Sequence, residues 1–146
     1  MSPRKISHRG RDRKLPYRRI TNALYLAAPK SEYDLPRYTR LLARVCTLFA
    51  NCTLVEAKTA YRSIAEWRAK WPVVLDSIDG LVFLSTEDGW IGRGVWTEVE
   101  AAWWRGLPVW YLTDAGRLVL YLDVTCSTPD PDNWTHHVRV SVESEA

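Results

Sequence analysis

Apolar and polar positions change period along the chain, and the changes predict strands and helices in turn. Leu81–Ser85 is a short apolar run, which is typical of a strand that is buried on both faces. A glycine-rich turn follows, and from Val95 the apolar residues recur at helical spacing until Gly106. Pro108–Leu112 is apolar again. The segment therefore predicts a strand, a glycine loop, a helix and a second strand, a unit that builds parallel sheets.

The N-terminal half repeats this alternation. Ile20–Ala27 is predicted to be a first strand and Thr53–Ala57 a second one. Between them, apolar residues with a 3.6-residue period predict a helix that has Asp34 as its cap and Pro36 at its first position. Asn51 is expected to close that helix.

A second helix is predicted to begin after a cap at Thr59 and to break or kink at Pro72. Its inward-facing residues are expected to be Ile64, Trp67 and Trp71. Together these elements predict a single α/β domain over residues 20–146, with a mostly parallel sheet.

The pattern changes after Leu112 and predicts an antiparallel extension on the edge of the sheet. Leu118–Thr125 is apolar and rich in β-branched residues, which predicts a strand. His136–Val142 alternates between apolar and polar residues, which predicts a further strand.

Charge is unevenly distributed along the 146 residues. Residues 1–19 hold eight Lys or Arg and one Asp, whereas the remainder holds 12 basic and 16 acidic residues. We expect residues 1–19 to form a disordered basic tail. Such a tail is able to contact nucleic acid weakly through phosphate groups, although a solvated tail explains the same composition.

Cysteine and histidine positions argue against a metal site or a disulfide framework. Cys46, Cys52 and Cys126 are odd in number and lack C-x-x-C spacing. His136 and His137 are neighbours in a predicted strand, so they point to opposite faces. No segment has the length of a membrane span or the character of a signal peptide, so we expect a cytoplasmic protein without metal or cofactor.

Glu98 is the strongest candidate for chemistry. It lies one turn inside the predicted helix, near the end of the sheet where parallel strands bind ligands. It follows Val95 by three residues and precedes Ala102 by four, so it is angled toward the buried face. A buried carboxylate needs a partner or a ligand. A surface acid stabilised by the helix dipole is the alternative interpretation.

The loop before this helix contains Gly89, Gly92 and Gly94. Its spacing differs from the dinucleotide fingerprint, but backbone N–H groups at a helix N-terminus are able to hold a phosphate. Arg93 is either a charge-assisted phosphate contact or an exposed residue on a tight turn. Trp90 is a candidate to cover a base.

Two stretches of the chain resemble the nucleoside 2-deoxyribosyltransferase superfamily, which includes 2′-deoxynucleoside 5′-phosphate N-hydrolases. Leu24–Pro29, L-Y-L-A-A-P, is similar to the family's first strand and nucleotide-binding loop, Y-L-A-G-P. Gly94–Ala102 and Gly106–Val109 are similar to the family's G-x-x-x-E-x-G-x-A helix and the G-K-P-V that follows it. The likeness extends over roughly Ala23 to Leu112.

The resemblance implies a flavodoxin-like, doubly wound fold and a homo-oligomer whose subunits complete each other's sites. It also implies N-glycosidic-bond cleavage or transfer on a deoxynucleoside or its 5′-monophosphate, with Glu98 attacking C1′ or stabilising the oxocarbenium-like transition state. The substrate-binding residues that it implies are Tyr25, Ala27, Ala28, Pro29, Asp88, Trp90, Gly92, Arg93 and Gly94.

The chain departs from the family pattern at two important positions. Ala28 replaces the loop glycine, which narrows the approach of a phosphate to the backbone. Trp71 stands where the hydrolases have a second carboxylate, eight residues before Asp79. Protonation of the leaving base then requires another acid, such as Glu87 or Asp88, or catalysis is weak or absent.

Two other functions therefore stay open. The missing acid favours a non-catalytic domain that binds or senses nucleotides. NAD cleavage by a domain similar to TIR domains is the other alternative, although the Y-L-A-A-P loop resembles the deoxyribosyltransferases more closely.

Overall fold

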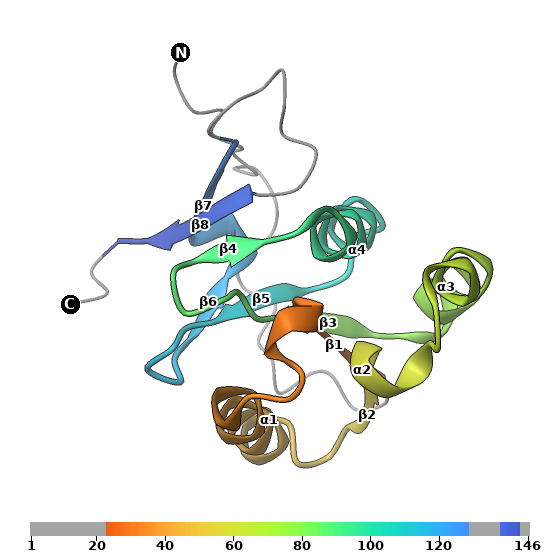
Figure 1. The fold of residues 1–146 in the computed structure, drawn as a ribbon, viewed down its shortest axis with the longest axis horizontal. Helices are drawn as coiled ribbons and strands as arrows, with labels where there is room; N and C mark the ends of the chain where they lie inside the picture. The colour runs from red at the N-terminus through yellow and green to blue at the C-terminus, as the bar shows by residue number, and fades with distance from the viewer. Residues whose placement is uncertain (1–22, 129–137, 144–146) are drawn as a thin grey trace.

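The structure is a computed structural model that describes residues 23–128 and 138–143. Its main sheet has five strands in the order β2-β1-β3-β5-β6 (Figure 1). The first four are parallel, and β6 runs antiparallel to β5. This order confirms the predicted flavodoxin-like, doubly wound α/β fold. The strands are Ala23–Ala27 (β1), Thr53–Glu56 (β2), Gly80–Phe83 (β3), Val109–Leu112 (β5) and Leu118–Leu120 (β6).

Helices cover both faces of this sheet. Helix α1 (Pro36–Leu48) packs on one face, and α3 (Ile64–Ser77) and α4 (Arg93–Trp104) pack on the other (Figure 1). Alternate residues of β1 divide between the two cores, because successive side chains of a strand point to opposite faces. Leu24 and Leu26 join the core beneath α1, whereas Tyr25 joins the core beneath α3 and α4.

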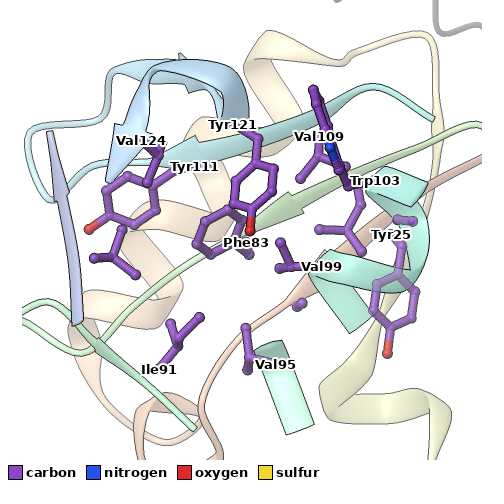
Figure 2. Packing of buried hydrophobic residues seen from close by; sticks show 14 of the residues in the cluster. Tyr25, Phe83, Ile91, Val95, Val99, Trp103, Val109, Tyr111, Tyr121 and Val124 are labelled. Atoms are coloured by element: carbon purple, nitrogen blue, oxygen red, sulfur yellow. The ribbon is translucent and has the colours of Figure 1, made fainter. Parts of the chain in front are cut away.

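The core beneath α3 and α4 is largely aromatic. The Phe83 ring lies 5.1 Å from that of Tyr111 and 5.9 Å from that of Tyr121, and Trp103 packs edge-on against Tyr121 at 5.4 Å. Figure 2 shows these rings grouped together, with Tyr25 at the edge of the cluster. The aromatic packing holds α4 on the sheet.

Helix α4 stops at Gly106, as predicted, but it begins at Arg93, so Arg93 and Gly94 lie in its first turn rather than in the predicted glycine loop. Gly92 is its N-cap in an extended conformation, and Gly106 follows its end with a φ of 88°. Positive φ favours glycine, so Gly106 ends the helix cleanly. The buried residues of α4 include Val95, Glu98 and Val99, which confirms that Glu98 faces the core side.

The prediction for the second helix was wrong about its cap and about one inward-facing residue. Thr59 lies inside a separate short helix, α2 (Ala57–Ala60), and Ser63 caps α3 by accepting a hydrogen bond of 3.1 Å from the Glu66 N–H. Ile64 is 59% exposed rather than inward-facing. The helix continues through Pro72 to Ser77, because Trp71 and Leu75 on either side of the proline are held in the core.

The first helix also differs at its ends. Pro36 is its first residue, as predicted, but the N-cap is Leu35 rather than Asp34. The helix ends at Leu48, before Asn51, where the Phe49 N–H donates to the Val45 carbonyl at 2.9 Å. The buried Phe49 side chain packs against Trp110 and turns the chain toward β2.

The C-terminal extension is antiparallel, but most of it leaves the main sheet. The predicted strand Leu118–Thr125 is interrupted by a 3-10 turn at Tyr121–Asp123, where the buried Tyr121 hydroxyl donates to Glu100 at 2.7 Å. Strands β7 (Val124–Ser127) and β8 (Val138–Val142) then form a second sheet with β4 (Trp90–Ile91), in the order β4-β8-β7.

Some predictions fall on residues that lie outside the described ranges, namely the basic tail of residues 1–19, the first three residues of the predicted strand Ile20–Ala27, His136 and His137. Within residues 23–128 and 138–143, the helices lack the combination of length and apolar character that crossing a membrane requires.

Candidate functional site

A cleft of about 840 Å³ opens at the C-terminal ends of the parallel strands. This is the end of the sheet at which α/β proteins bind ligands, and the volume suits a small molecule such as a nucleotide. Three segments surround the cleft: the loop after β1, the α2–α3 region and the first two turns of α4. Its lining residues are Ala28, Pro29, Lys30, Tyr33, Ala57, Tyr61, Ser63, Ile64, Trp67, Arg68, Gly92, Arg93, Gly94, Val95, Thr97 and Glu98.

Glu98 is a buried carboxylate on the wall of this cleft, with 3% of its surface exposed. Two donors from different elements converge on its Oε2 atom. The Tyr25 hydroxyl from β1 donates one hydrogen bond, and the Trp67 indole N–H from α3 donates another at 3.0 Å. Both bonds reach the same oxygen, so Oε1 takes part in neither of them. The carboxylate is thus held rigidly on one side.

Burial changes the acidity of Glu98. Desolvation is the largest influence and raises the pKa of the carboxyl to about 7, against the opposing effect of the hydrogen bonds from Tyr25 and Trp67. At neutral pH the side chain therefore exists in both its protonated and its ionised forms. A carboxyl poised in this way, on the wall of a cleft, is typical of groups that take part in catalysis.

Tyrosines extend the hydrogen-bonded group away from Glu98. The Tyr61 hydroxyl lies 3.3 Å from the Tyr25 hydroxyl, and Tyr61 itself lines the cleft. Desolvation by burial, followed by the charge of Glu98, raises the pKa of Tyr25. Burial likewise raises the pKa of Tyr61. Both phenols are therefore neutral at physiological pH and act as hydroxyl donors and acceptors.

Trp71 occupies the place of the second carboxylate that the family resemblance leads one to expect. It is buried, and its ring packs against Tyr25 with a centroid distance of 5.0 Å. The position therefore supplies packing for the Tyr25 ring and supplies no acid. Glu98 is the only carboxylate among the described residues that line the cleft.

Three cations line the cleft: Lys30, Arg68 and Arg93. Arg93 is the first residue of α4, and backbone N–H groups at that helix N-terminus also favour negative charge. The site is thus suited to an anionic ligand. Lys30 and Arg68 were not among the predicted binding residues, although Lys30 directly follows the loop that resembles Y-L-A-G-P.

The loop after β1 is held in place by Arg37, which sequence reasoning also missed. Its guanidinium donates to the buried Glu32 at 2.7 Å, to the Ser85 carbonyl at 2.8 Å and to Asp114 at 2.5 Å. The hydrogen bond from Arg37 lowers the pKa of Asp114. These contacts join the loop that carries Lys30 to the ends of β3 and β5.

The predicted site residues fall into two groups. Those that line the cleft are Ala28, Pro29, Gly92, Arg93, Gly94 and Glu98, with Tyr25 hydrogen-bonded to Glu98 and Ala27 buried in β1. Asp88 and Trp90 are not among the cleft-lining residues. Trp90 belongs to β4, and the guanidinium of Arg139 on β8 lies 5.4 Å from its ring.

Gly89, in the turn before α4, and Gly94, in the first turn of that helix, have different roles. Gly89 has a φ of 87°, and a Cβ at this position would lie 2.9 Å from the Val140 carbonyl oxygen. Gly89 therefore allows the turn to pass close to β8. A Cβ at Gly94 would meet no atom within 4 Å, so the cleft beside it has open space.

Within the described residues, no three His, Cys, Asp or Glu side chains gather closely enough to hold a metal ion. No family model and no curated protein matches the sequence. A solved structure, a conserved protein from Enterococcus faecalis V583, is 24% identical to this chain. The match covers 61% of each of the two chains, with a TM-score of 0.47.

Proposed function

We propose that this protein cleaves or transfers the N-glycosidic bond of a deoxynucleoside or deoxynucleoside 5′-monophosphate. The observation that supports this most strongly is the buried carboxyl of Glu98, which lies on the cleft wall with its Oε2 held by Tyr25 and Trp67. Positive charge develops at C1′ as such a bond breaks, and a fixed carboxylate stabilises or captures it. Glu98 is the nucleophile or the electrostatic stabiliser.

The remaining groups of the cleft suit the other parts of such a substrate. Lys30, Arg68 and Arg93 provide positive charge for a phosphate near the α4 N-terminus. Tyr33 and Trp67 provide aromatic surface for a sugar or a base. These features favour a nucleotide over an apolar ligand of the same size.

The experiment that tests this function measures release of free base. The purified full chain is incubated with a panel of deoxynucleosides, their 5′-monophosphates and NAD, and the products are separated by chromatography. Wild type is expected to release base from a deoxynucleoside or its monophosphate, and Glu98→Gln is expected to release none above background. Glu100→Gln is the matched control, because Glu100 lies on the same helix but contacts Tyr121. Base release only from NAD would instead support the TIR-like alternative.

A non-catalytic nucleotide-binding or sensing domain is the second candidate. It is favoured by the presence of Trp71 where a second acid is expected and by Glu98 as the only carboxylate among the described cleft residues. This function predicts that wild type and Glu98→Gln both bind an intact nucleotide and that neither converts it. Calorimetric titration with the panel distinguishes the two candidates.

The homo-oligomer that the resemblance implies is a further proposal. Sedimentation of the full chain at several concentrations tests it, with a monomer mass at all concentrations as the opposing result. Weak nucleic-acid contact through residues 1–19 is tested by DNA and RNA binding of the full chain against a chain that lacks these residues, as a function of salt.

A further inference from the structure

Glu98, Tyr25 and Tyr61 form a continuous hydrogen-bonded chain, and both of its end residues, Glu98 and Tyr61, line the cleft. Tyr25 bonds Glu98 Oε2 directly, and its oxygen lies 3.3 Å from that of Tyr61. Tyr25 is fully buried, whereas Tyr61 is half-buried and lines the cleft. A carboxyl group and a hydroxyl thus lie on the wall of the same cleft and are joined through the buried Tyr25.

We propose that Tyr61 is the acid that protonates the departing base, and that it draws its proton from Glu98 through Tyr25. This inference rests on the proposed function and explains how a site without a second carboxylate completes the reaction. Two hydrogen bonds in series separate Tyr61 from Glu98 by roughly 5 Å, which is on the order of the separation between acid and nucleophile in retaining glycosidases.

The proton transfers balance in both halves of the reaction. Glu98 gives its proton to the Tyr25 oxygen as Tyr25 gives its own to Tyr61, and Tyr61 gives its own to a base nitrogen. The C1′–N bond breaks with its electron pair on the base, which leaves neutral. The Glu98 carboxylate formed by this transfer then binds C1′ as an ester or faces the oxocarbenium ion.

Water completes the cycle by attack on C1′. The bond between C1′ and the Glu98 oxygen, where it has formed, breaks with its electron pair on the carboxylate. The proton of the water passes to Tyr61, from Tyr61 to Tyr25 and from Tyr25 to Glu98. The enzyme returns to its starting state, with a protonated carboxyl and two neutral phenols.

The acidities of the three groups agree with these roles. Burial raises the pKa of both phenols, which disfavours either phenolate, so the proton moves along the chain in one concerted transfer. Glu98 is the group that titrates near neutrality, with a pKa of about 7, and is therefore able to supply the proton and then act as a carboxylate. One carboxyl group thereby serves both steps.

The test compares two substrates that differ in their need for an acid. The base of 2′-deoxyguanosine needs a proton to leave, whereas that of 7-methyl-2′-deoxyguanosine already carries a positive charge and leaves as a neutral molecule. Both are used as nucleosides and as 5′-monophosphates. The variants are Tyr61→Phe, Glu98→Gln and Tyr33→Phe, the last being a matched control that removes a different hydroxyl from the same cleft.

Tyr61→Phe is expected to slow base release from 2′-deoxyguanosine by about 100-fold or more, and to change release from the methylated substrate by less than about fivefold. Tyr33→Phe is expected to leave the ratio between the two substrates unchanged, and Glu98→Gln is expected to abolish both reactions. Thermal unfolding of each variant verifies that it is folded.

Equal slowing of both substrates by Tyr61→Phe, or no slowing of either, overturns the role of Tyr61. The proposed function survives that result if Glu98→Gln is still inactive. If the wild-type protein releases base from neither of these two substrates, the role of Tyr61 is overturned. If it releases base from no member of the whole panel, the proposed function is overturned as well.

Discussion

Replacing Glu98 with glutamine is expected to stabilise the folded protein at pH 8 and to leave its stability nearly unchanged at pH 4.5. Glutamine has almost the same shape as glutamate, and its carbonyl oxygen is able to accept the hydrogen bonds from Tyr25 and Trp67. The substitution therefore removes the ionisable group and keeps the packing of the cleft wall.

The size of the effect follows from the pKa of Glu98. Burial raises it from 4.5 to about 7 in the folded protein, so the folded state binds this proton more tightly than the unfolded chain does. The favourable contribution is complete below pH 4.5 and is lost as the pH rises toward 7. At pH 8 the ionised side chain costs the folded state about 3 kcal/mol.

Urea unfolding at the two pH values measures this difference. A change of about 3 kcal/mol moves the midpoint by roughly 1.5 M urea for a protein of this size. Glu66→Gln is the control, because the hydrogen bond from Lys70 lowers the pKa of that exposed carboxyl and its replacement shifts stability in the opposite direction. The raised pKa of Glu98 is refuted if the difference in unfolding free energy between Glu98→Gln and wild type is the same at pH 4.5 and at pH 8.

Two further substitutions test the framework of the site. Arg37→Met is expected to destabilise the protein by about 3 kcal/mol, because it leaves the buried Glu32 without its partner. Arg40→Met removes only an exposed contact to Asp114, which Arg37 also binds, and is expected to cost less than about 1 kcal/mol. Equal losses of stability for the two variants in urea unfolding contradict this reasoning. Gly89→Ala is expected to destabilise the protein by about 2 kcal/mol, because Gly89 has a positive φ and lies close to the Val140 carbonyl. Gly94→Ala is expected to stabilise the protein slightly. A higher melting temperature for Gly89→Ala than for Gly94→Ala contradicts the role of Gly89.

The parallel part of the fold follows directly from the apolar pattern. Strands β1, β3 and β5 are short apolar runs, and α4 lies between Gly92 and Gly106. Helix ends were harder to predict from local preference: the N-cap of α1 is Leu35 rather than Asp34. Packing also outweighs local preference inside α3, where the buried Trp71 and Leu75 retain Pro72 within the helix.

The candidate site was predictable in its centre and less so at its edges. The spacing of Glu98 within α4 indicated a buried carboxyl, and its burial is what the structure has. Its partner Trp67, the relay residue Tyr61 and the cations Lys30 and Arg68 lie far from it in sequence, so only tertiary structure brings them to one cleft. Trp90 joins a second sheet through pairing with Arg139, which no local pattern indicates.

The ionised Glu98 side chain lowers the stability of the folded protein above neutral pH, and this loss bears on function. A residue that lowers stability by about 3 kcal/mol is expected to persist where an activity requires it, since exchange for glutamine removes the cost with little change of shape. The cleft is therefore interpreted as a functional site rather than a packing defect.

The most direct test of the central claim is the ratio of kcat/KM for base release between wild type and Glu98→Gln on the best substrate of the panel. The account predicts a loss of at least about 1,000-fold for Glu98→Gln and less than about tenfold for Glu100→Gln. Wild-type activity in Glu98→Gln would contradict the assignment of this carboxyl to the chemistry.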